Sequence, residues 1–119
     1  MRRGGVYWVS DNSLSLPPND KRNMRHRRPV IIVSGDEKNE NSDWPIVLVV
    51  PISTSPRMKT EFCLQIGANV ANLPEKGWAR VVAVQPLAKD DVSDYIGRLP
   101  AAMLALLEEN LFDYMGLTD

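Results

Sequence analysis

Two apolar runs decide the fold of this chain: RRPVIIVS at residues 27–34 and IVLVVPIS at residues 46–53. Each run is rich in β-branched residues and has the length of a strand that is buried on both faces. Pro29 fits only at the start of the first strand, because proline cannot donate to the hydrogen bonds within a sheet. If the two strands pair, Arg28 and Ser53 can meet at one end of a sheet. A fixed cation beside a hydroxyl suits a phosphodiester, and this favours a protein that acts on RNA.

Further strands are expected on both sides of these two runs. The stretch GVYWV at residues 5–9 is rich in aromatic and β-branched residues. Apolar and polar residues alternate over residues 60–66, which is the pattern of a half-buried strand, and residues 78–87 are a fifth candidate. Residues 10–26 have no periodicity, so they predict a long, mobile loop.

A helix is predicted near the C-terminal end of the chain. Pro100 fits its first position, and Gly116 can end it in a left-handed conformation. Residues 90–97 are expected to form one or two helical turns. Strands followed by a terminal helix predict an α+β fold with a curled antiparallel sheet, in a single domain over residues 1–119. The apolar positions that recur at helical spacing are Met103, Leu106, Leu107, Leu111 and Tyr114.

Composition excludes several classes of protein. The net charge of −1 provides no overall field for nucleic acid, so attraction must come from local clusters such as the basic residues between 21 and 28. Cys63 is the only cysteine, which excludes an internal disulfide and fits a reducing cytoplasm. With a single histidine, His26, far from that cysteine, no zinc site and no other metal or cofactor is expected. No apolar run approaches the roughly 20 residues that cross a bilayer.

The candidate functional residues lie at the two strand ends. Arg25, His26, Arg27 and Arg28 precede or open the first apolar run. A guanidinium is always charged and can donate to two phosphate oxygens at once. The plain alternative is that these arginines are solvated charges that keep a sheet edge soluble. Ser53 by itself could equally cap a turn, and His26 could move a proton or have no role.

Four segments, in matching order and spacing, resemble the MazF/PemK family of toxin endoribonucleases, the toxin halves of type II toxin–antitoxin modules. The resemblance implies an SH3-like barrel of five to seven mostly antiparallel strands with a C-terminal α-helix. It also implies metal-independent, sequence-specific cleavage of single-stranded RNA, which inhibits translation and growth. The segments are RGGVYWV at residues 3–9, RPVIIVS at residues 28–34, VVPIS at residues 49–53, and Gln85-Pro86.

The resemblance implies two protein partners as well. One is a cognate antitoxin that lays an extended, acidic segment over the RNA groove. The other is a second copy of the chain in a homodimer. Leu14, Leu16 and Trp44 are the apolar residues expected to be exposed for that contact.

Matched position by position, Arg28 corresponds to the family's catalytic arginine and Ser53 to its catalytic threonine, with the hydroxyl kept. Gln85 corresponds to a glutamine at the surface that recognises bases. In the implied reaction the ribose 2′-OH attacks the adjacent phosphate, giving a 2′,3′-cyclic phosphate and a free 5′-OH, so DNA is not cleaved. Arg28 would stabilise charge on the phosphoryl oxygens, and Ser53 would bond the phosphate or assist proton movement. The residues expected to bind RNA are Gln85, Arg27, Arg25, His26 and Thr54.

Several positions depart from the family pattern. Gly5 stands where the family usually has an acidic residue, and Val82 and Val84 stand where some members have polar ones. Leu87-Ala88 replaces the usual Arg-Thr pair. Three alternatives to an active ribonuclease therefore stay open: a non-catalytic relative that binds RNA or protein, a toxin that inhibits gyrase, and an unrelated small β-barrel.

Overall fold

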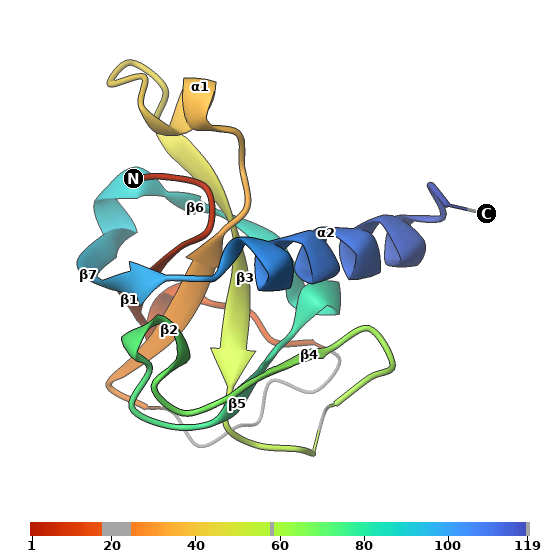
Figure 1. Cartoon of the computed structure of the whole chain (residues 1–119). Coiled ribbons are helices and arrows are strands. Elements are labelled where there is room, and N and C mark those ends of the chain that lie inside the picture. The colour runs from red at the N-terminus through yellow and green to blue at the C-terminus, as the bar shows by residue number, and fades with distance from the viewer. Residues whose placement is uncertain (18–24, 58, 119) are drawn as a thin grey trace.

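The computed structural model of the chain describes residues 1–17, 25–57 and 59–118. Seven strands and two helices follow one another along these residues (Figure 1). Short 3₁₀ turns connect several of them. In chain order the elements are β1 (Gly5–Ser10), β2 (Arg27–Ile32), α1 (Asp36–Asn39), β3 (Ile46–Ser53), β4 (Leu64–Ile66), β5 (Gly77–Ala79), β6 (Gln85–Ala88), β7 (Val92–Arg98) and α2 (Ala101–Met115).

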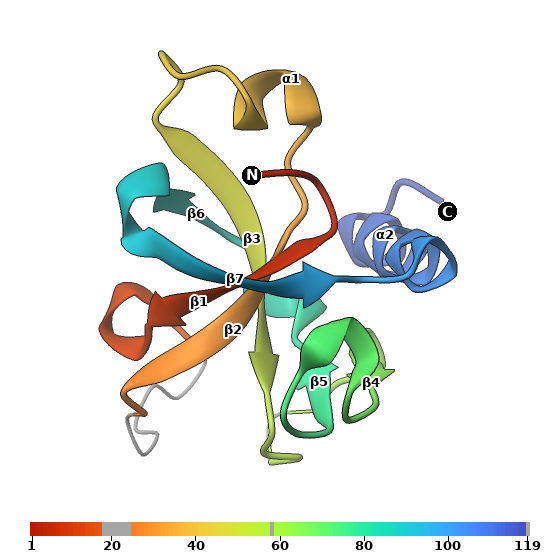
Figure 2. The same ribbon diagram turned by 60° about the vertical axis from the view of Figure 1, so that its left-hand side comes forward.

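The strands form one antiparallel sheet in the order β4-β5-β3-β2-β1-β7, with β6 also paired to β3. The two apolar runs are its neighbouring central strands, as predicted: Val30 of β2 lies opposite Pro51 of β3. β3 is the longest strand because two others share one of its sides. Residues 46–49 pair with β6, while residues 52–53 pair with β5. The sheet curls around β3, with α1 at one end and the β4–β5 pair toward the other (Figure 2).

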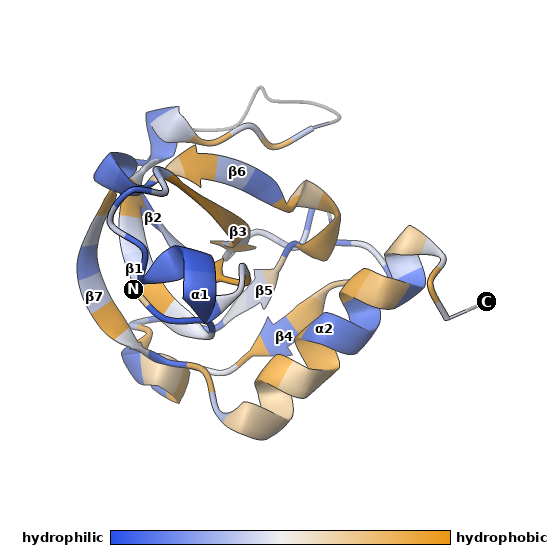
Figure 3. Cartoon of the chain, turned by 90° about the horizontal axis from the view of Figure 1, so that it is seen from above, coloured by the Kyte–Doolittle hydropathy of each residue, from blue (hydrophilic) through white to orange (hydrophobic). Residues whose placement is uncertain are grey.

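Two apolar clusters lie on the two faces of the central strands. Val30 and Ile32 belong to one cluster, while Ile31, between them in the sequence, belongs to the other. This is the burial on both faces that a continuous apolar run predicts. Most of β3 has the hydrophobic colour in Figure 3. Full burial of a valine or isoleucine side chain contributes about 1.5–3 kcal/mol. The central strands are therefore a rigid base for residues at their ends.

The C-terminal helix covers the cluster that contains Ile31. Leu107 is fully buried there, with Met103, Leu104 and Leu111 packed around it. The helix begins directly after Pro100 and ends before Gly116, whose φ of 77° is the predicted left-handed conformation. The predicted apolar face was wrong in part: Leu106 and Tyr114 are about half exposed, because the buried face is centred on Leu104 and Leu107.

Three predicted elements differ from the observed ones. The predicted strand at 60–66 is reduced to β4, since residues 60–63 turn instead. The predicted strand at 78–87 is split into β5 and β6 by a 3₁₀ turn at Val81–Ala83. The split occurs because the two halves pair with different parts of β3. Residues 90–97 were predicted as helical turns, but only Asp90 and Asp91 lie in a 3₁₀ turn, whereas residues 92–97 belong to β7, which pairs with β1.

Part of the predicted mobile loop at 10–26 is packed. Ser10 belongs to β1, and the side chains of Leu14 and Leu16 are only 5% and 4% exposed. The expectation that these leucines are exposed for a dimer contact was therefore wrong; Leu14 joins the cluster that contains Val30. Trp44 is exposed as expected. The part of the predicted loop at 18–24 lies outside the described residues.

A helix must be long and apolar to cross a membrane. In the described ranges, no helix is both long enough and apolar enough to do so.

Candidate active site

Arg28 is held at the start of β2 by groups from β3 and from the 3₁₀ turn that follows β1. Its Nε donates to Asp11 Oδ1 at 3.0 Å, and its Nη1 donates to the carbonyl of Ile52 at 3.3 Å. The side chains of Arg28 and Asp11 are 6% and 0% exposed. A buried charge is tolerated only with such a partner. The guanidinium is therefore fixed in position and orientation rather than free in solvent.

One nitrogen of this guanidinium remains available. Arg28 Nη2 makes no hydrogen bond with any residue that the structure describes. Arg28 also lines a cavity of about 230 Å³, which is large enough for a phosphate group. With Arg25, Arg27 and His26 on the same walls, the cavity is suited to an anion. The residues that line it are Trp8, Arg25, His26, Arg27, Arg28, Pro29, Ile52 and Thr54.

The other two arginines of the cavity are also positioned by specific contacts. The Arg27 guanidinium lies 4.1 Å from the centre of the Trp8 ring, a cation–π contact that restrains a half-exposed side chain. Arg25 donates from Nη2 to Thr54 Oγ1 at 2.5 Å. Its backbone N–H donates to the second oxygen of Asp11 at 2.9 Å. Asp11 thus orients two cations of the cavity.

Ser53 lies at the end of β3 nearest to Arg28. Continuing the β2–β3 register places the two residues opposite each other, and Arg28 contacts the carbonyl of Ile52, the residue before Ser53. The Ser53 side chain is 8% exposed and accepts the N–H of Ser55 at 3.2 Å. The next residue, Thr54, lines the cavity, whereas Ser53 is not among its lining residues. The structure therefore brings the predicted cation and hydroxyl segment to one end of the sheet.

Gln85, another predicted site residue, also lies outside this cavity. It lines a second hollow of about 150 Å³ together with Ser15, Pro17 and residues 82–84. Its amide exchanges two hydrogen bonds with the backbone of Ser15, at 3.0 and 2.8 Å. Arg80 donates from Nη2 to the carbonyl of Pro17 at 3.1 Å. Gln85 and Arg80 together hold the start of the segment that follows β1.

Sequence reasoning missed Asp11 and Trp8 as parts of this site. Trp8 belongs to β1 and Asp11 lies in the turn directly after it, and β1 pairs with β2 so that Val9 lies opposite Arg28. Asp11 comes just after one predicted strand and Arg28 stands at the start of the next. Pairing these two strands in the prediction would have indicated the contact between Asp11 and Arg28. Among the described residues, no three histidine, cysteine or acidic side chains lie close enough together to hold a metal ion.

The family described as PemK-like, MazF-like toxin of type II toxin–antitoxin system matches this chain over residues 2–114. The chain belongs to this family. The match spans nearly all of the 119 residues and confirms the resemblance inferred from the four sequence segments.

Relatives and solved structures of MazF-like proteins agree with this assignment. Endoribonuclease MazF9 of Mycobacterium tuberculosis (strain ATCC 25618 / H37Rv) is 27% identical over 114 residues, covering 93% of this chain and 92% of that protein. The structure of Mycobacterium tuberculosis toxin MazF-mt6 is 18% identical with a TM-score of 0.73, covering 94% of this chain and 96% of that one. An endoribonuclease in complex with its cognate antitoxin from a mycobacterial species is 23% identical with a TM-score of 0.72, covering 98% and 96%. These structures confirm the predicted fold class of a MazF-like antiparallel sheet with a C-terminal helix.

Proposed function

We propose that this chain is the toxin of a type II toxin–antitoxin system and an endoribonuclease that cleaves single-stranded RNA. The observation that carries the proposal is the state of Arg28. Its guanidinium is buried and fixed by Asp11 and the Ile52 carbonyl, its Nη2 has no hydrogen-bond partner among the described residues, and Arg28 lines a cavity together with Arg25, His26 and Arg27. Membership of the MazF-like family and relatives named as endoribonucleases support the same activity.

The proposed reaction is transfer of a phosphoryl group within the RNA strand. The ribose 2′-OH loses its proton and attacks the adjacent phosphorus, and the bond to the 5′-oxygen breaks. The products are a 2′,3′-cyclic phosphate and a 5′-OH that has gained a proton. Arg28 stabilises the charge that develops on the phosphoryl oxygens, which is the kind of preorganised contact that lowers barriers most. Ser53 donates a hydrogen bond to the phosphate or assists the proton movement.

The remaining predicted residues bind the strand in this proposal. Arg25, His26, Arg27 and Thr54 share the cavity wall with Arg28 and contact phosphates or sugar edges. Gln85 reads a base from the second hollow, and for this its amide must exchange the backbone of Ser15 for the edge of a base. Such contacts to phosphates give affinity, and the contact to the base gives sequence preference.

The activity is tested with purified protein and a mixed-sequence single-stranded RNA in EDTA. We expect cleavage without added metal, 2′,3′-cyclic phosphate ends, and no cleavage of the same sequence as DNA. RNA that is bound but left intact at stoichiometric protein would favour a non-catalytic relative. Gyrase trapped on DNA, with RNA intact, would favour a gyrase-inhibiting toxin. Either result would overturn the proposal.

The proposed partners are a cognate antitoxin and a second copy of the chain. A mycobacterial endoribonuclease of the same fold has been solved with its cognate antitoxin. For the homodimer, Trp44, Ile46 and Leu48 offer an apolar surface, each being 37–44% exposed. A monomeric mass in light scattering at micromolar concentration would contradict the dimer. We place the protein in the cytoplasm, where its single cysteine stays reduced.

A further inference from the structure

Trp78 lies beside Ser53 in the sheet. The two residues are directly opposite each other in the β3–β5 pair, and Gln65 of β4 is opposite Trp78 on its other side. Residues that face each other in antiparallel strands point to the same side of the sheet. Ser53, Trp78 and Gln65 therefore form one row that runs away from the cavity across three strands.

The close approach of β5 to β3 depends on Gly77. A Cβ atom built at Gly77 would lie 2.9 Å from the Ile52 side chain and 3.0 Å from the Ser53 carbonyl oxygen. Only a residue without a side chain permits this spacing, and it brings the following Trp78 to the side of Ser53. The backbone spacing at Gly77 therefore helps to place the indole.

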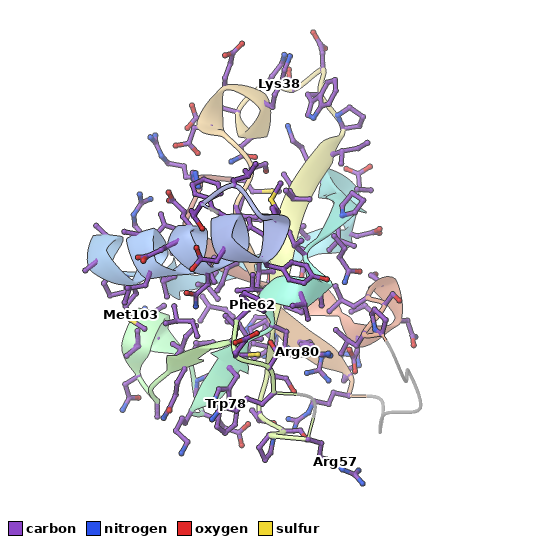
Figure 4. The ribbon with its side chains drawn as sticks, turned by 90° about the vertical axis from the view of Figure 1, so that its right-hand side faces the viewer. Lys38, Arg57, Phe62, Trp78, Arg80 and Met103 are labelled. Carbon is purple, nitrogen blue, oxygen red and sulfur yellow. The ribbon has the colours of Figure 1, made fainter. Side chains whose placement is uncertain are left out.

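The exposed part of the Trp78 ring is hydrocarbon flanked by cations. Its Nε1 atom is buried and has no hydrogen-bond partner among the described residues, and Trp78 as a whole is partly buried, so any part of the ring that solvent reaches is hydrocarbon. The ammonium groups of Lys59 and Lys76 lie 5.6 and 5.5 Å from the ring centre. Arg57 lies at the same end of the molecule, the end opposite Lys38 (Figure 4).

This arrangement is continuous with the candidate active site. Besides the direct pairing of Trp78 with Ser53, Arg25 links the cavity to the turn before β5. Its Nη1 lies 3.8 Å from Glu75, while its Nη2 donates to Thr54 of the cavity wall. A strand of RNA that leaves the cavity along this side reaches Trp78 next.

We propose that Trp78, Lys59 and Lys76 form a stacking subsite for a base of the single-stranded RNA, next to the scissile position. The inference rests on the proposed function and deepens it. The base stacks on the indole face in place of one ammonium group, and that lysine then pairs with the adjoining phosphate. Stacking on an aromatic ring tolerates any base and occurs where strands are single. The lysines supply the charge complementarity that an RNA backbone requires.

The test compares variants at Trp78 that differ in aromatic character. Fluorescence anisotropy measures the binding of a labelled single-stranded DNA of about 12 nucleotides. This length is within the range that the grooves of single-strand-binding proteins accommodate. DNA lacks the nucleophile of the proposed reaction, so binding is measured without cleavage. Trp78→Leu keeps apolar bulk for the fold but loses the ring face, and we expect about tenfold weaker binding. Trp78→Phe keeps a ring face and should stay within about threefold of the unaltered protein.

The lysines and two distant residues provide the second measurement and the controls. A plot of log affinity against log salt concentration has a negative slope. Lys59→Gln and Lys76→Gln should each make this slope less steep by about 0.7. Lys38→Gln is the matched control for charge, because Lys38 also lies over a tryptophan ring but at the other end of the molecule (Figure 4). Phe112→Ala is the control for an exposed aromatic residue, on α2. Neither control should change the affinity or the slope.

Cleavage of RNA by the unaltered protein, measured in parallel, separates this inference from the proposed function. If the unaltered protein cleaves RNA and the Trp78→Leu and Trp78→Phe variants bind DNA with the same affinity as each other, the stacking subsite is overturned and the ribonuclease activity is retained. If Trp78→Leu weakens DNA binding, Trp78→Phe does not, and the unaltered protein leaves RNA intact, the subsite is supported and the ribonuclease activity is overturned. An effect of Trp78→Leu that is confined to an acidic peptide would overturn the subsite in favour of a protein partner.

Discussion

Replacing Arg28 with lysine is expected to slow RNA cleavage by at least about 100-fold. Lysine keeps the positive charge beside buried Asp11, so the fold is retained, but its three donors sit on one nitrogen and lack the planar spread by which Arg28 reaches the carboxylate, the Ile52 carbonyl and a phosphate from separate nitrogens. The rate of cleavage of a fluorescent RNA substrate in EDTA measures the effect. Circular dichroism of the same sample establishes that the variant is folded.

Arg27→Lys is the matched control for this prediction. Arg27 also lines the cavity, but its side chain is 49% exposed and rests on the Trp8 ring. Its replacement should weaken RNA binding by a few-fold and leave the rate at saturating RNA near that of the unaltered protein. If Arg28→Lys and Arg27→Lys were equally active at saturation, Arg28 would have no special part in the reaction.

Replacing Asp11 with alanine is expected to lower the free energy of unfolding by about 3–5 kcal/mol. The substitution leaves the Arg28 guanidinium buried without its carboxylate and removes the acceptor of the Arg25 backbone N–H. Urea denaturation at neutral pH measures the loss. A double variant, Asp11→Ala with Arg28→Met, should be more stable than Asp11→Ala alone, because no unpaired charge remains buried.

Asp94→Ala is the matched control for the Asp11 prediction. Asp94 also pairs with an arginine, Arg27, at 3.8 Å, but its side chain is 81% exposed. Exposed ion pairs of this kind contribute little to stability. Equal losses for Asp11→Ala and Asp94→Ala would mean that the Asp11–Arg28 pair does not hold the cavity together.

The sequence predicts most reliably the elements whose own residues decide their structure. β2 and β3 are continuous apolar runs, and their burial on both faces follows directly from that composition. The helix α2 is bounded by Pro100 and Gly116, each of which acts through its own backbone geometry. In these elements the local preference and the tertiary structure agree.

Predictions failed where tertiary pairing overrides local pattern. Residues 78–87 are apolar enough for one strand. Their two halves pair with different parts of β3, as β5 and β6, and the strand is interrupted between these halves. Residues 92–98 become β7 because β1 has an open side to pair with. Strand composition alone carries no information on which edges remain unpaired.

The sequence identifies Arg28 as the central residue of the candidate site, but it does not identify the residues that hold Arg28 and the neighbouring segment in place. Arg28 and the hydroxyl segment follow from the ends of two strands that were expected to pair. Asp11 is 17 residues away, in a stretch without periodicity, and only the β1–β2 pairing brings it to Arg28. Contacts between Gln85 and Ser15 span 70 residues and have no sequence signal.

The most direct test of the proposed chemistry is a crystal structure of the protein with a short RNA whose 2′-oxygens are methylated, so that the nucleophile is blocked. We expect one phosphate in the cavity, with an oxygen within about 3.2 Å of Arg28 Nη2 and the Ser53 hydroxyl bonded to the same phosphate. RNA bound elsewhere on the molecule, or a phosphate that contacts neither group, would contradict the assignment of Arg28 and Ser53 to a single scissile bond.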